Sequence, residues 1–513
     1  MKILLTGSTG FVGSAVAKGM IRSNFKVVAA VRKIPVHSKI NHNNICYKII
    51  GDIDSQTEWS DALNDVDTVV HCAAYNHILK KNLNERQIFN KINVEGTLQL
   101  AKQAAKHKIK RLVFISSIKV TGEHSPPGQL LDENSIPKPQ DIYAESKFKA
   151  EKLLMNFSHS TSMEVVILRS PIIYGPGVKG NFAKIIGWLE SGFPLPFGKI
   201  NNLRSFIGIE NFVSVVLLCT EVQRSPNAAN EIFVISDGED ISTTTLLKKI
   251  SKAAGLTNLL IPVPNYFIFI LGFLLGRSTS TGKLLNNLQV NITKINHLLN
   301  WKPPVSIDEQ LSRMFKKTNS LKIYSPKNVV LFRIFDIIFS SIGIVILIPI
   351  LMLLYIIGKF DTGFPLFKQK RIGRYEKSFV LIKFRTMDIN THNMASHLIS
   401  AESVTNFGKI LRRTKLDELP QLWNVLNGEM SLVGPRPGLI NQYALTNYRK
   451  KHNIFFVRPG ITGLAQISGI DMSTPKLLAE TDAKMLKELN IRNYFKFIIL
   501  TIFGKGKRVS IRK

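Results

Sequence analysis

The sequence predicts an α/β fold, in which a Rossmann-type doubly wound parallel sheet is followed by a membrane helix and a mainly helical second domain. Three observations support it. Short apolar runs alternate with helical patterns in the first half of the 513 residues, a glycine-rich turn follows the first run, and residues 337–357 carry no charge. We expect domains at residues 1–318 and 359–513, a linker at 319–330 and the membrane helix at 331–358.

The sheet is expected from five short runs rich in β-branched residues. In chain order these are Lys2–Leu5, Lys26–Val31, Thr68–His71, Leu112–Ser116 and Val165–Leu168. Helical patterns such as 12–23 and 93–107 lie between them, and this alternation places helices on both faces of a parallel sheet. Glycine- and proline-rich stretches at 171–180 and 192–198 predict a small substrate subdomain near the strand ends.

Composition and charge exclude several classes of protein. Hydrophobic residues make up 45% and charged residues 20% of the chain, which excludes a disordered, collagenous or coiled-coil protein. Three cysteines cannot form a disulfide framework and indicate a reducing compartment, and we expect no signal peptide. The net charge of +32 favours anionic lipid or phosphorylated substrates. No nucleic-acid partner is expected, because zinc spacings, aromatic RNA-binding signatures and long cationic runs are not found.

A dinucleotide site is predicted at the first strand–helix turn. Glycines there let the backbone approach a pyrophosphate at a helix N-terminus. The cofactor-binding turn comprises Gly7, Gly10, Phe11, Val12 and Gly13. The second strand ends at Arg32-Lys33 without the acid that binds a ribose 2′-hydroxyl. This favours NADP as the cofactor and leaves NAD as the alternative.

A proton-transfer site is predicted from a Tyr and a Lys one helical turn apart. Tyr143 and Lys147 share one helix face, and Ser117 follows the fourth strand. A nearby cation lowers the pKa of a phenol, so Tyr143 is expected to exchange a proton with a sugar oxygen near neutral pH. The three residues are the expected catalytic group of the first domain.

With the glycine turn and this triad, residues 1–318 resemble the extended short-chain dehydrogenase/reductases that act on nucleotide sugars. The stretches 114–122 and 174–182 are most similar to 4-ketoreductases that form UDP-N-acetyl-quinovosamine. The resemblance implies cofactor contacts at Asp52, Ile53, Ala73, Ala74, Tyr143, Lys147 and Pro171, a supporting Asn93, and nucleotide-sugar contacts at Asn181 and Arg204. It implies reduction of a UDP-4-keto-6-deoxy-N-acetylhexosamine with NAD(P)H.

The alternative implied by the same resemblance is a UDP-N-acetylhexosamine 4-epimerase. Epimerases of the family usually carry Tyr at the position of Thr121 and an acid near Val31. A reductase exchanges its cofactor in every turnover, whereas an epimerase retains it. The missing acid therefore favours the reductase.

The charge-free segment is long enough to cross a bilayer core of about 30 Å. Pro349 would kink or break the helix, and Arg333 and Asp336 are expected to satisfy the freed backbone groups. Cations flank both ends, so both are assigned to the cytoplasm; an ordinary spanning helix is the alternative. The shorter apolar segment 266–275 is predicted as core or as a surface-skimming helix.

A phosphate site is predicted around the adjacent carboxylates Asp417 and Glu418. Arg412 precedes them, and two Gly/Pro turns that carry Arg436 and Arg458 follow. Guanidinium groups bind phosphate in a bidentate manner. A carboxylate beside cations and a divalent metal can attack phosphorus.

Residues 327–513 resemble the monotopic bacterial sugar transferases that load sugar 1-phosphate onto a polyprenyl phosphate. The dyad, both turns, Arg333–Asp336 and Lys383–Met387 (which holds Arg385) carry the resemblance. It implies that Asp417 attacks a UDP-sugar, that Asp417 and Glu418 hold Mg²⁺, and that undecaprenyl phosphate accepts the sugar phosphate. Arg385, Arg412, Arg436 and Arg458 are the expected substrate contacts. Phe332 and Ile348 depart from the family pattern.

Together these resemblances imply a bifunctional enzyme on the bacterial inner membrane, with both domains facing the cytoplasm. It would initiate an O-antigen, capsule or other glycan. A homodimer is one option for the assembly. A degenerate scaffold that only senses nucleotide sugars is a further alternative.

Overall fold

In the computed structural model, the described residues are 1–34, 43–76, 84–192, 194–256, 260–274, 278–315, 326–388 and 403–502. They divide into two compact units. The first comprises Met1–Ile186, Pro196–Ala253 and Leu260–Phe315, and the second takes in the rest of the described chain. Of the expected linker at 319–330, residues 319–325 lie outside the described residues.

The first unit is built on a seven-stranded sheet in the order β3-β2-β1-β4-β5-β6-β9, and every neighbouring pair is parallel. The strands are β1 (Lys2–Thr6), β2 (Lys26–Val31), β3 (Ile45–Ile49), β4 (Thr68–His71), β5 (Arg111–Ser117), β6 (Glu164–Ser170) and β9 (Glu231–Val234). The five predicted strands are confirmed, and β3 and β9 are additional. The strand order reverses between β1 and β4, which is where such sheets bind their ligands.

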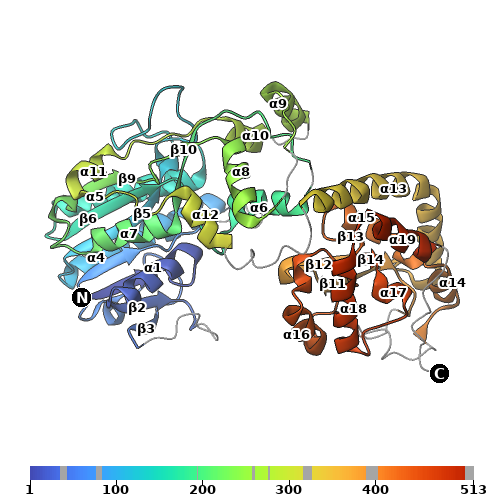
Figure 1. Ribbon diagram of the computed structural model, residues 1–513. Helices are drawn as coiled ribbons and strands as arrows, with labels where there is room; N and C mark the ends of the chain where they lie inside the picture. The colour runs from blue at the N-terminus through green and yellow to red at the C-terminus, as the bar shows by residue number, and fades with distance from the viewer. Residues whose placement is uncertain are drawn as a thin grey trace. The chain divides into compact units, whose positions relative to one another are not determined.

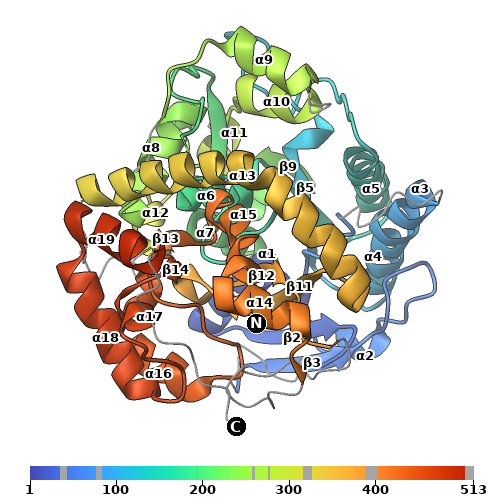
Figure 2. The same ribbon diagram turned by 90° about the vertical axis from the view of Figure 1, so that its right-hand side faces the viewer.

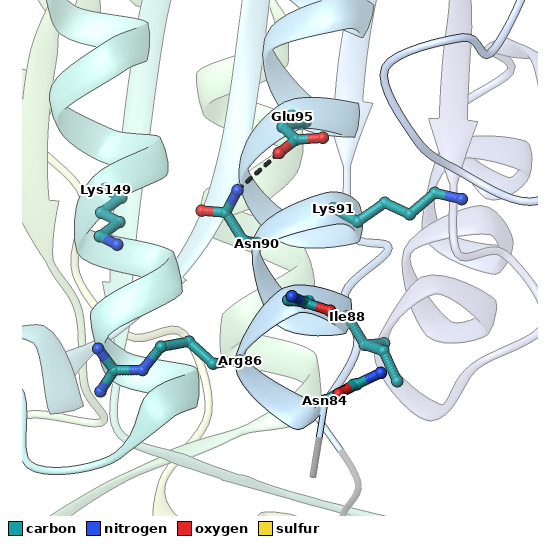
Figure 3. A pocket seen from close by; sticks show the side chains of 8 residues that line it. Asn84, Arg86, Ile88, Asn90, Lys91, Glu95 and Lys149 are labelled. Carbon is teal, nitrogen blue, oxygen red and sulfur yellow. Dashed lines mark hydrogen bonds between the residues drawn. The ribbon is translucent and has the colours of Figure 1, made fainter. Parts of the chain in front are cut away.

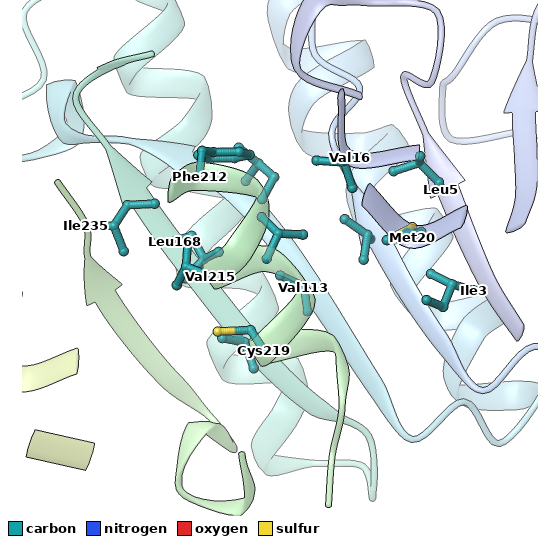
Figure 4. Packing of buried hydrophobic residues seen from close by; sticks show 14 of the residues in the cluster. Ile3, Leu5, Val16, Met20, Val113, Leu168, Phe212, Val215, Cys219 and Ile235 are labelled. Carbon is teal, nitrogen blue, oxygen red and sulfur yellow. The ribbon is translucent and has the colours of Figure 1, made fainter. Parts of the chain in front are cut away.

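Helices cover both faces of this sheet (Figure 1). On one face, α1 (Phe11–Arg22) and α7 (Ile209–Thr220) pack through Val16, Met20 and Phe212 onto the strands (Figure 4). On the other face lie α2 (Ser60–Leu63), α4 (Gly96–Lys106) and α5 (Ile142–His159). The helix expected at 93–107 differs at its start: Glu85–Phe89 forms α3, and Asn90–Glu95 is π-helical before α4 begins.

The predicted subdomain contains a small three-stranded sheet in the order β10-β8-β7. Its strands are β7 (Ile172–Tyr174), β8 (Arg204–Gly208) and β10 (Asp240–Ile241). The helices of this part are α6 (Gly180–Ser191), α8 (Thr243–Ala254), α9 (Asn265–Leu274), α10 (Ser278–Leu285), α11 (Thr293–Leu299) and α12 (Ile307–Phe315). Helix α9 contains most of the short apolar segment 266–275, and most of its large side chains are exposed. The prediction that this segment belongs to the hydrophobic core is therefore wrong.

The second unit begins with α13 (Pro326–Thr362). Among the described residues it is the one helix long and apolar enough to cross a membrane, by length and composition. Pro349 lies inside this continuous helix, and Figures 1 and 2 show a bend in its course. Proline removes a backbone donor and clashes with the preceding turn, so a proline inside a helix favours such a bend.

The rest of this unit is mainly helical, as predicted. It contains the antiparallel pair β11 (Leu366–Ile372) and β12 (Ser378–Phe384), and the parallel pair β13 (Ser431–Val433) and β14 (Gly460–Thr462). Its helices are α14 (Asn406–Thr414), α15 (Gln421–Leu426), α16 (Tyr443–Lys451), α17 (Leu464–Ile467), α18 (Pro475–Glu488) and α19 (Ile491–Ile502).

Arg333 and Asp336 do not satisfy backbone groups at Pro349, contrary to expectation. Arg333 donates to the carbonyls of Val425 and Leu426 at 2.6 and 2.8 Å. Asp336 accepts hydrogen bonds from β13 and from the hydroxyl of Tyr494, the latter at 2.6 Å. Asp336 is 13 residues from Pro349, which is about 20 Å along a helix.

The departure at Phe332 has a packing reason: the ring is buried and stacks on Tyr494 at 4.9 Å between centroids. Ile348 is 45% exposed.

Candidate active sites

The glycine turn between β1 and α1 is shaped for close backbone approach. Gly7 has a φ of +70°, and a Cβ there would lie 2.8 Å from the amide nitrogen of Ala73. A Cβ on Gly13 would lie 2.2 Å from the carbonyl oxygen of Gly7. Gly10 stands at the N-cap of α1, and Phe11 and Val12 open the helix. The predicted turn therefore has the geometry of a pyrophosphate cradle.

The loop after β4, which holds Ala73 and Ala74, is tied to this turn through buried side chains. The amide of Ala73 donates to the hydroxyl of Thr6 at 3.1 Å, and that oxygen lies 2.8 Å from Nδ1 of His71. Nε2 of His71 lies 3.1 Å from the hydroxyl of Thr97, which donates to the carbonyl of Asn93. Burial lowers the pKa of His71 to about 3. Sequence reasoning missed this network; polar residues inside an apolar strand were its available signal.

Lys147 is buried in the first unit, and Tyr143 lies on the same helix. Nζ of Lys147 donates to the carbonyl of Ile115 at 2.8 Å and lies 4.3 Å from the ring centroid of Phe114. Burial lowers the pKa of Lys147 to about 8. Burial also raises the pKa of Tyr143 to about 12, and the charge of Asp141 acts in the same direction. The expected lowering of the Tyr143 pKa is therefore wrong, because desolvation dominates.

Ser117 lies at the end of β5 and caps a short 3-10 turn, where its Oγ accepts from the amide of Lys119 at 3.3 Å. Its neighbour Ser116 donates to Glu151 at 2.5 Å, and Glu151 forms a buried ion pair with Arg169 at 2.7 Å. Sequence reasoning missed Glu151, which follows Lys147 by four residues on the same face of α5. The pair anchors α5 to the strands that carry the predicted serine.

Asn93 occupies the π-helical turn and fixes the loop before α3. Its Oδ1 accepts from the amide of Tyr75 at 2.8 Å, and its Nδ2 donates to the carbonyl of Tyr75 and to Ser146. Ser146 precedes Lys147 on α5. Asn93 therefore links the loop after β4 to the helix that carries Tyr143.

The nucleoside end of the predicted site holds an exposed pair of opposite charges. Arg32 follows β2 and lies 3.7 Å from Asp52, with both side chains about 80% exposed. Ile53 is half-buried on the α4 side of the sheet. The structure thus brings together the three residues expected there, and the Asp52 carboxylate accompanies the Arg32 cation.

The predicted sugar-side residues differ in exposure. Pro171 is buried between β6 and β7, and Asn181 is exposed in the first turn of α6. Arg204 is buried in β8 and donates to the carbonyl of Asn286 at 2.9 Å. Burial lowers the pKa of Arg204 to about 10. Thr121 is buried, and its hydroxyl donates to the carbonyl of Ile118 at 2.8 Å.

A surface hollow elsewhere on this unit is lined by α3, the π-helical turn and Lys149 (Figure 3). Two of its cations are paired, Arg86 with Glu145 and Lys91 with Asp54, both at 3.1 Å. It contains none of the predicted catalytic residues.

In the second unit, the dyad lies in a short 3-10 turn, Leu416–Glu418, between α14 and α15. Burial and the charge of Glu418 raise the pKa of Asp417 to about 6, whereas the charges of Lys383, Arg412 and Arg436 oppose this. Glu418 forms an ion pair with Arg436 at 3.0 Å. The structure therefore gathers the carboxylates and two predicted arginines into one polar cluster.

Lys383 is the member of this cluster that sequence reasoning did not single out. Burial lowers the pKa of Lys383 to about 8, and Asp417 acts in the opposite direction. Lys383 lies on β12 opposite Phe367 of β11, and its Nζ is 5.3 Å from the centroid of that ring. Arg371, further along β11, donates to the carbonyl of Pro437 at 3.1 Å. The sequence could have indicated this residue, because Lys383 is the first residue of the motif that contains Arg385.

The predicted arginines occupy different places. Arg412 donates to Thr386 at 2.9 Å and lies within electrostatic range of Asp417. Arg385 donates to the carbonyl of Phe364 at 3.0 Å. Arg458 donates to the carbonyl of Gly428 at 2.9 Å.

A buried ion pair supports the turn that carries Arg436. Arg449 pairs with Asp482 at 2.6 Å, and both side chains are almost fully buried. Arg449 also donates to the carbonyl of Arg436 at 2.8 Å. This hydrogen bond holds the backbone of the turn at Arg436 in place.

The dyad suits a metal that needs few protein ligands. Among the described residues, none form a group of three or more His, Cys, Asp or Glu. Mg²⁺ commonly binds through one or two carboxylates and completes its shell with water and substrate phosphates. Asp417 and Glu418 fit that pattern.

The two sites define a class of protein: an α/β unit with a glycine-rich turn after its first strand, joined to an apolar helix and to a unit that carries a carboxylate–arginine cluster. Comparisons agree. Residues 3–236 match the NAD dependent epimerase/dehydratase family, and residues 327–507 match the bacterial sugar transferase family. The UDP-glucose 4-epimerase of Vibrio cholerae is 38% identical over 324 residues, covering 62% of this chain and 96% of that protein.

Two relatives and one solved structure extend the comparison. The exopolysaccharide production protein PSS of Rhizobium leguminosarum bv. phaseoli is 36% identical, covering 34% of this chain and 94% of that protein. The UDP-glucose:undecaprenyl-phosphate glucose-1-phosphate transferase of Klebsiella pneumoniae is 38% identical; the match covers 34% of this chain and 40% of that transferase. The UDP-glucuronic acid 4-epimerase of Bacillus cereus, solved with UDP-glucuronic acid and NAD, is 25% identical with a TM-score of 0.50, covering 62% of this chain and 99% of that one.

The chain belongs to both families: its first part is an epimerase/dehydratase-family short-chain dehydrogenase/reductase, and its second part is a bacterial sugar transferase.

Proposed function

We propose that the chain finishes a UDP-sugar and then transfers its sugar 1-phosphate to undecaprenyl phosphate. The first unit would reduce a UDP-4-keto-6-deoxy-N-acetylhexosamine at C4, and the second would load the product onto the lipid. The observation that carries the proposal is the Asp417–Glu418 cluster with its surrounding cations, in a chain whose other unit retains the Tyr143–Lys147 pair.

In the first unit, bound NAD(P)H would supply the hydride. Tyr143 would donate its proton to O4 of the sugar, which its high pKa favours because a phenol near 12 remains protonated at neutral pH. Lys147, with a pKa near 8, would hold the ribose and offer a charge to the phenolate. Ser117 would polarise the carbonyl by donating a hydrogen bond.

The choice of reductase over epimerase is supported at two positions. Arg32 stands where a ribose-binding acid is usual, and this cation suits a 2′-phosphate. Thr121 replaces the family tyrosine, and its hydroxyl is turned to the carbonyl of Ile118. NADPH is therefore the proposed cofactor.

A UDP-N-acetylhexosamine 4-epimerase is the second candidate for this unit. The 38% identity to a UDP-glucose 4-epimerase over nearly its whole length favours it, and so does the NAD in the solved epimerase. Asp52 beside Arg32 also supplies a carboxylate near the nucleoside end. Such an enzyme would keep its cofactor tightly bound.

In the second unit, Asp417 would attack the β-phosphate of the UDP-sugar, and UMP would leave. An oxygen of the polyprenyl phosphate would then attack the aspartyl phosphosugar, take up the sugar phosphate and release the Asp417 carboxylate. Lys383, Arg412 and Arg436 would hold the diphosphate and offset its charge. Asp417 and Glu418 would hold Mg²⁺, which would screen the phosphate oxygens.

We propose that α13 enters and leaves one leaflet, so that both units face the cytoplasm of a bacterial inner membrane. The bend in α13 and the proline inside this helix, Pro349, support a re-entrant course, and cations flank both ends of the helix. Cysteine accessibility at each end of α13 in intact spheroplasts tests this; labelling of either end from outside would favour the spanning alternative.

The first test of function is NADPH absorbance with the purified full chain and UDP-4-keto-6-deoxy-N-acetylglucosamine. Stoichiometric loss of NADPH, abolished by Tyr143→Phe, is the expected result. Conversion of UDP-N-acetylglucosamine to its 4-epimer without net cofactor consumption would contradict the reductase. Unchanged glycan output in cells that carry both Tyr143→Phe and Asp417→Ala would point to a scaffold.

A further inference from the structure

Helix α9 in the first unit exposes an unusually apolar face. Its described residues from Asn265 to Leu274 include no charged side chain. Six large side chains are between 49% and 74% exposed, namely Tyr266, Phe267, Phe269, Ile270, Phe273 and Leu274. With aromatic side chains of 150–250 Å², this face presents roughly 600 Å² of apolar surface. Patches of this size mark interaction surfaces on soluble domains.

The opposite side of α9 packs against the rest of the first unit. Ile268 is buried, and Gly272 lies against α10, where a Cβ would meet Oγ1 of Thr281 at 2.0 Å. At 100° per residue, these two positions share one side of the helix, whereas the six exposed side chains cover a continuous arc of about 160° opposite to them. Figures 1 and 2 both show α9 at the outer edge of its unit, beside α10.

The charge around α9 indicates which partner covers this face. No acidic residue lies between Asp240 and Asp308, a stretch of 67 residues. The same stretch holds seven Lys and Arg. Three of these cations are ion-paired with acids from other segments: Lys249 with Glu239 and Asp308, Lys283 with Glu123, and Lys294 with Glu231. Aromatic and aliphatic side chains on one helix face, within a stretch of chain that carries cations and no acid of its own, are typical of helices that lie in the interface of an anionic membrane. At 10 residues α9 is about 15 Å long, too short to span a bilayer.

The same chain carries α13, whose apolar side chains are equally exposed, for example Ile346 at 67%. A chain held at a bilayer by α13 keeps its first unit near lipid at high local concentration. We propose that α9 is a second, interfacial membrane contact, through which the first unit inserts aromatic side chains into an anionic lipid surface. This proposal rests on the membrane association proposed above for α13.

The test places a fluorescent label at matched exposed positions of the full chain. Phe273→Cys reports on α9, Ile346→Cys reports on α13, and Ile49→Cys on the edge strand β3 is the control. Their native side chains are 68%, 67% and 63% exposed. Cys46, the exposed native cysteine, is changed to Ser in each variant. Each protein carries an environment-sensitive dye and is reconstituted in phosphatidylcholine vesicles that contain phosphatidylglycerol.

The expected result is a blue-shifted emission at Phe273→Cys that shallow nitroxide lipids quench, with no such response at Ile49→Cys. Quenching at Ile346→Cys with none at Phe273→Cys would overturn the α9 proposal and leave the membrane association of α13 intact. No quenching at either Phe273→Cys or Ile346→Cys would contradict both the α9 proposal and the membrane association of α13. A blue shift at Phe273→Cys that depends on protein concentration and not on nitroxide lipid would assign the face to a second copy of the chain, and would also overturn the proposal.

Discussion

His71 should make the first unit sensitive to mild acid. The hydroxyl of Thr97 donates to the carbonyl of Asn93, so it can only accept from Nε2–H of His71. Thr6 accepts from the amide of Ala73 and donates its hydroxyl proton to Nδ1. The chain of hydrogen bonds therefore runs in one direction and requires the neutral ring. A second proton on Nδ1 would break it in a fully buried place.

The magnitude follows from the two pKa values of His71. The pKa is about 3 in the folded protein and 6.5 for the unperturbed group. Because the folded-state pKa is the lower one, the unfolded chain binds more protons between these values. The stability contribution is complete above pH 6.5 and is lost as the pH falls towards 3. At about 1.4 kcal/mol per pH unit, lowering the pH from 6.5 to 5 should cost about 2 kcal/mol.

The assay is denaturant unfolding of the full chain near pH 7.5 and pH 5. His71→Gln carries no titrating group, so its stability difference between the two pH values should be smaller than that of the wild type by about 2 kcal/mol. His107→Gln, at an exposed position after α4, is the matched control and should behave as wild type. An equal pH difference in wild type and His71→Gln would refute the directional network.

Three further predictions concern single residues. Glu151→Ala should lower the free energy of unfolding by about 3–5 kcal/mol, because its arginine partner would be left buried without a counter-charge; Glu151→Gln should cost less in the same denaturation assay. Gly13→Ala should displace the carbonyl of Gly7 and reduce turnover of the first unit on the order of 100-fold, whereas Gly187→Ala, with open space around it, should not. As the proposed nucleophile, Asp417 would have to be ionised to attack phosphorus, and its pKa is about 6, so the transferase rate should fall as the pH drops below 6; Asp417→Asn should abolish transfer and spare the first reaction.

The sequence was sufficient for the framework of both units. Apolar runs with β-branched residues located five strands, because parallel strands are buried on both faces and leave a continuous hydrophobic signal. The edge strand β3 was missed because it alternates between half-buried and exposed residues and carries Cys46, Tyr47 and Lys48. The π-helical turn at Asn90–Glu95 has no periodicity of its own that distinguishes it from an α-helix.

The chemistry of the sites was harder to predict, because pKa values depend on burial. A Tyr and a Lys at a spacing of four residues indicate proximity, but the Lys147 ammonium is directed to the carbonyl of Ile115. Desolvation then raises the pKa of Tyr143 instead of lowering it. Similarly, a Gly/Pro turn with an arginine indicates a phosphate clamp, but the spacing does not indicate that Arg458 also donates to the carbonyl of Gly428. Spacing predicts which residues are near each other, and the surrounding packing decides where their charges point.

The polar residues in the first third of α13 explain how an apolar helix can position the proposed phosphate site. Apolar contacts with lipid are non-directional, so they fix neither the rotation nor the depth of a helix. Arg333 supplies direction: its guanidinium binds the carbonyls of Val425 and Leu426, where a cation is favoured by the C-terminal dipole of α15. Asp336 accepts from β13 and from the hydroxyl of Tyr494, which holds the same turn of α13 from another side. Because α15 begins at Gln421, three residues after Glu418, these contacts connect the proposed membrane helix to the proposed nucleophile Asp417 through one short helix.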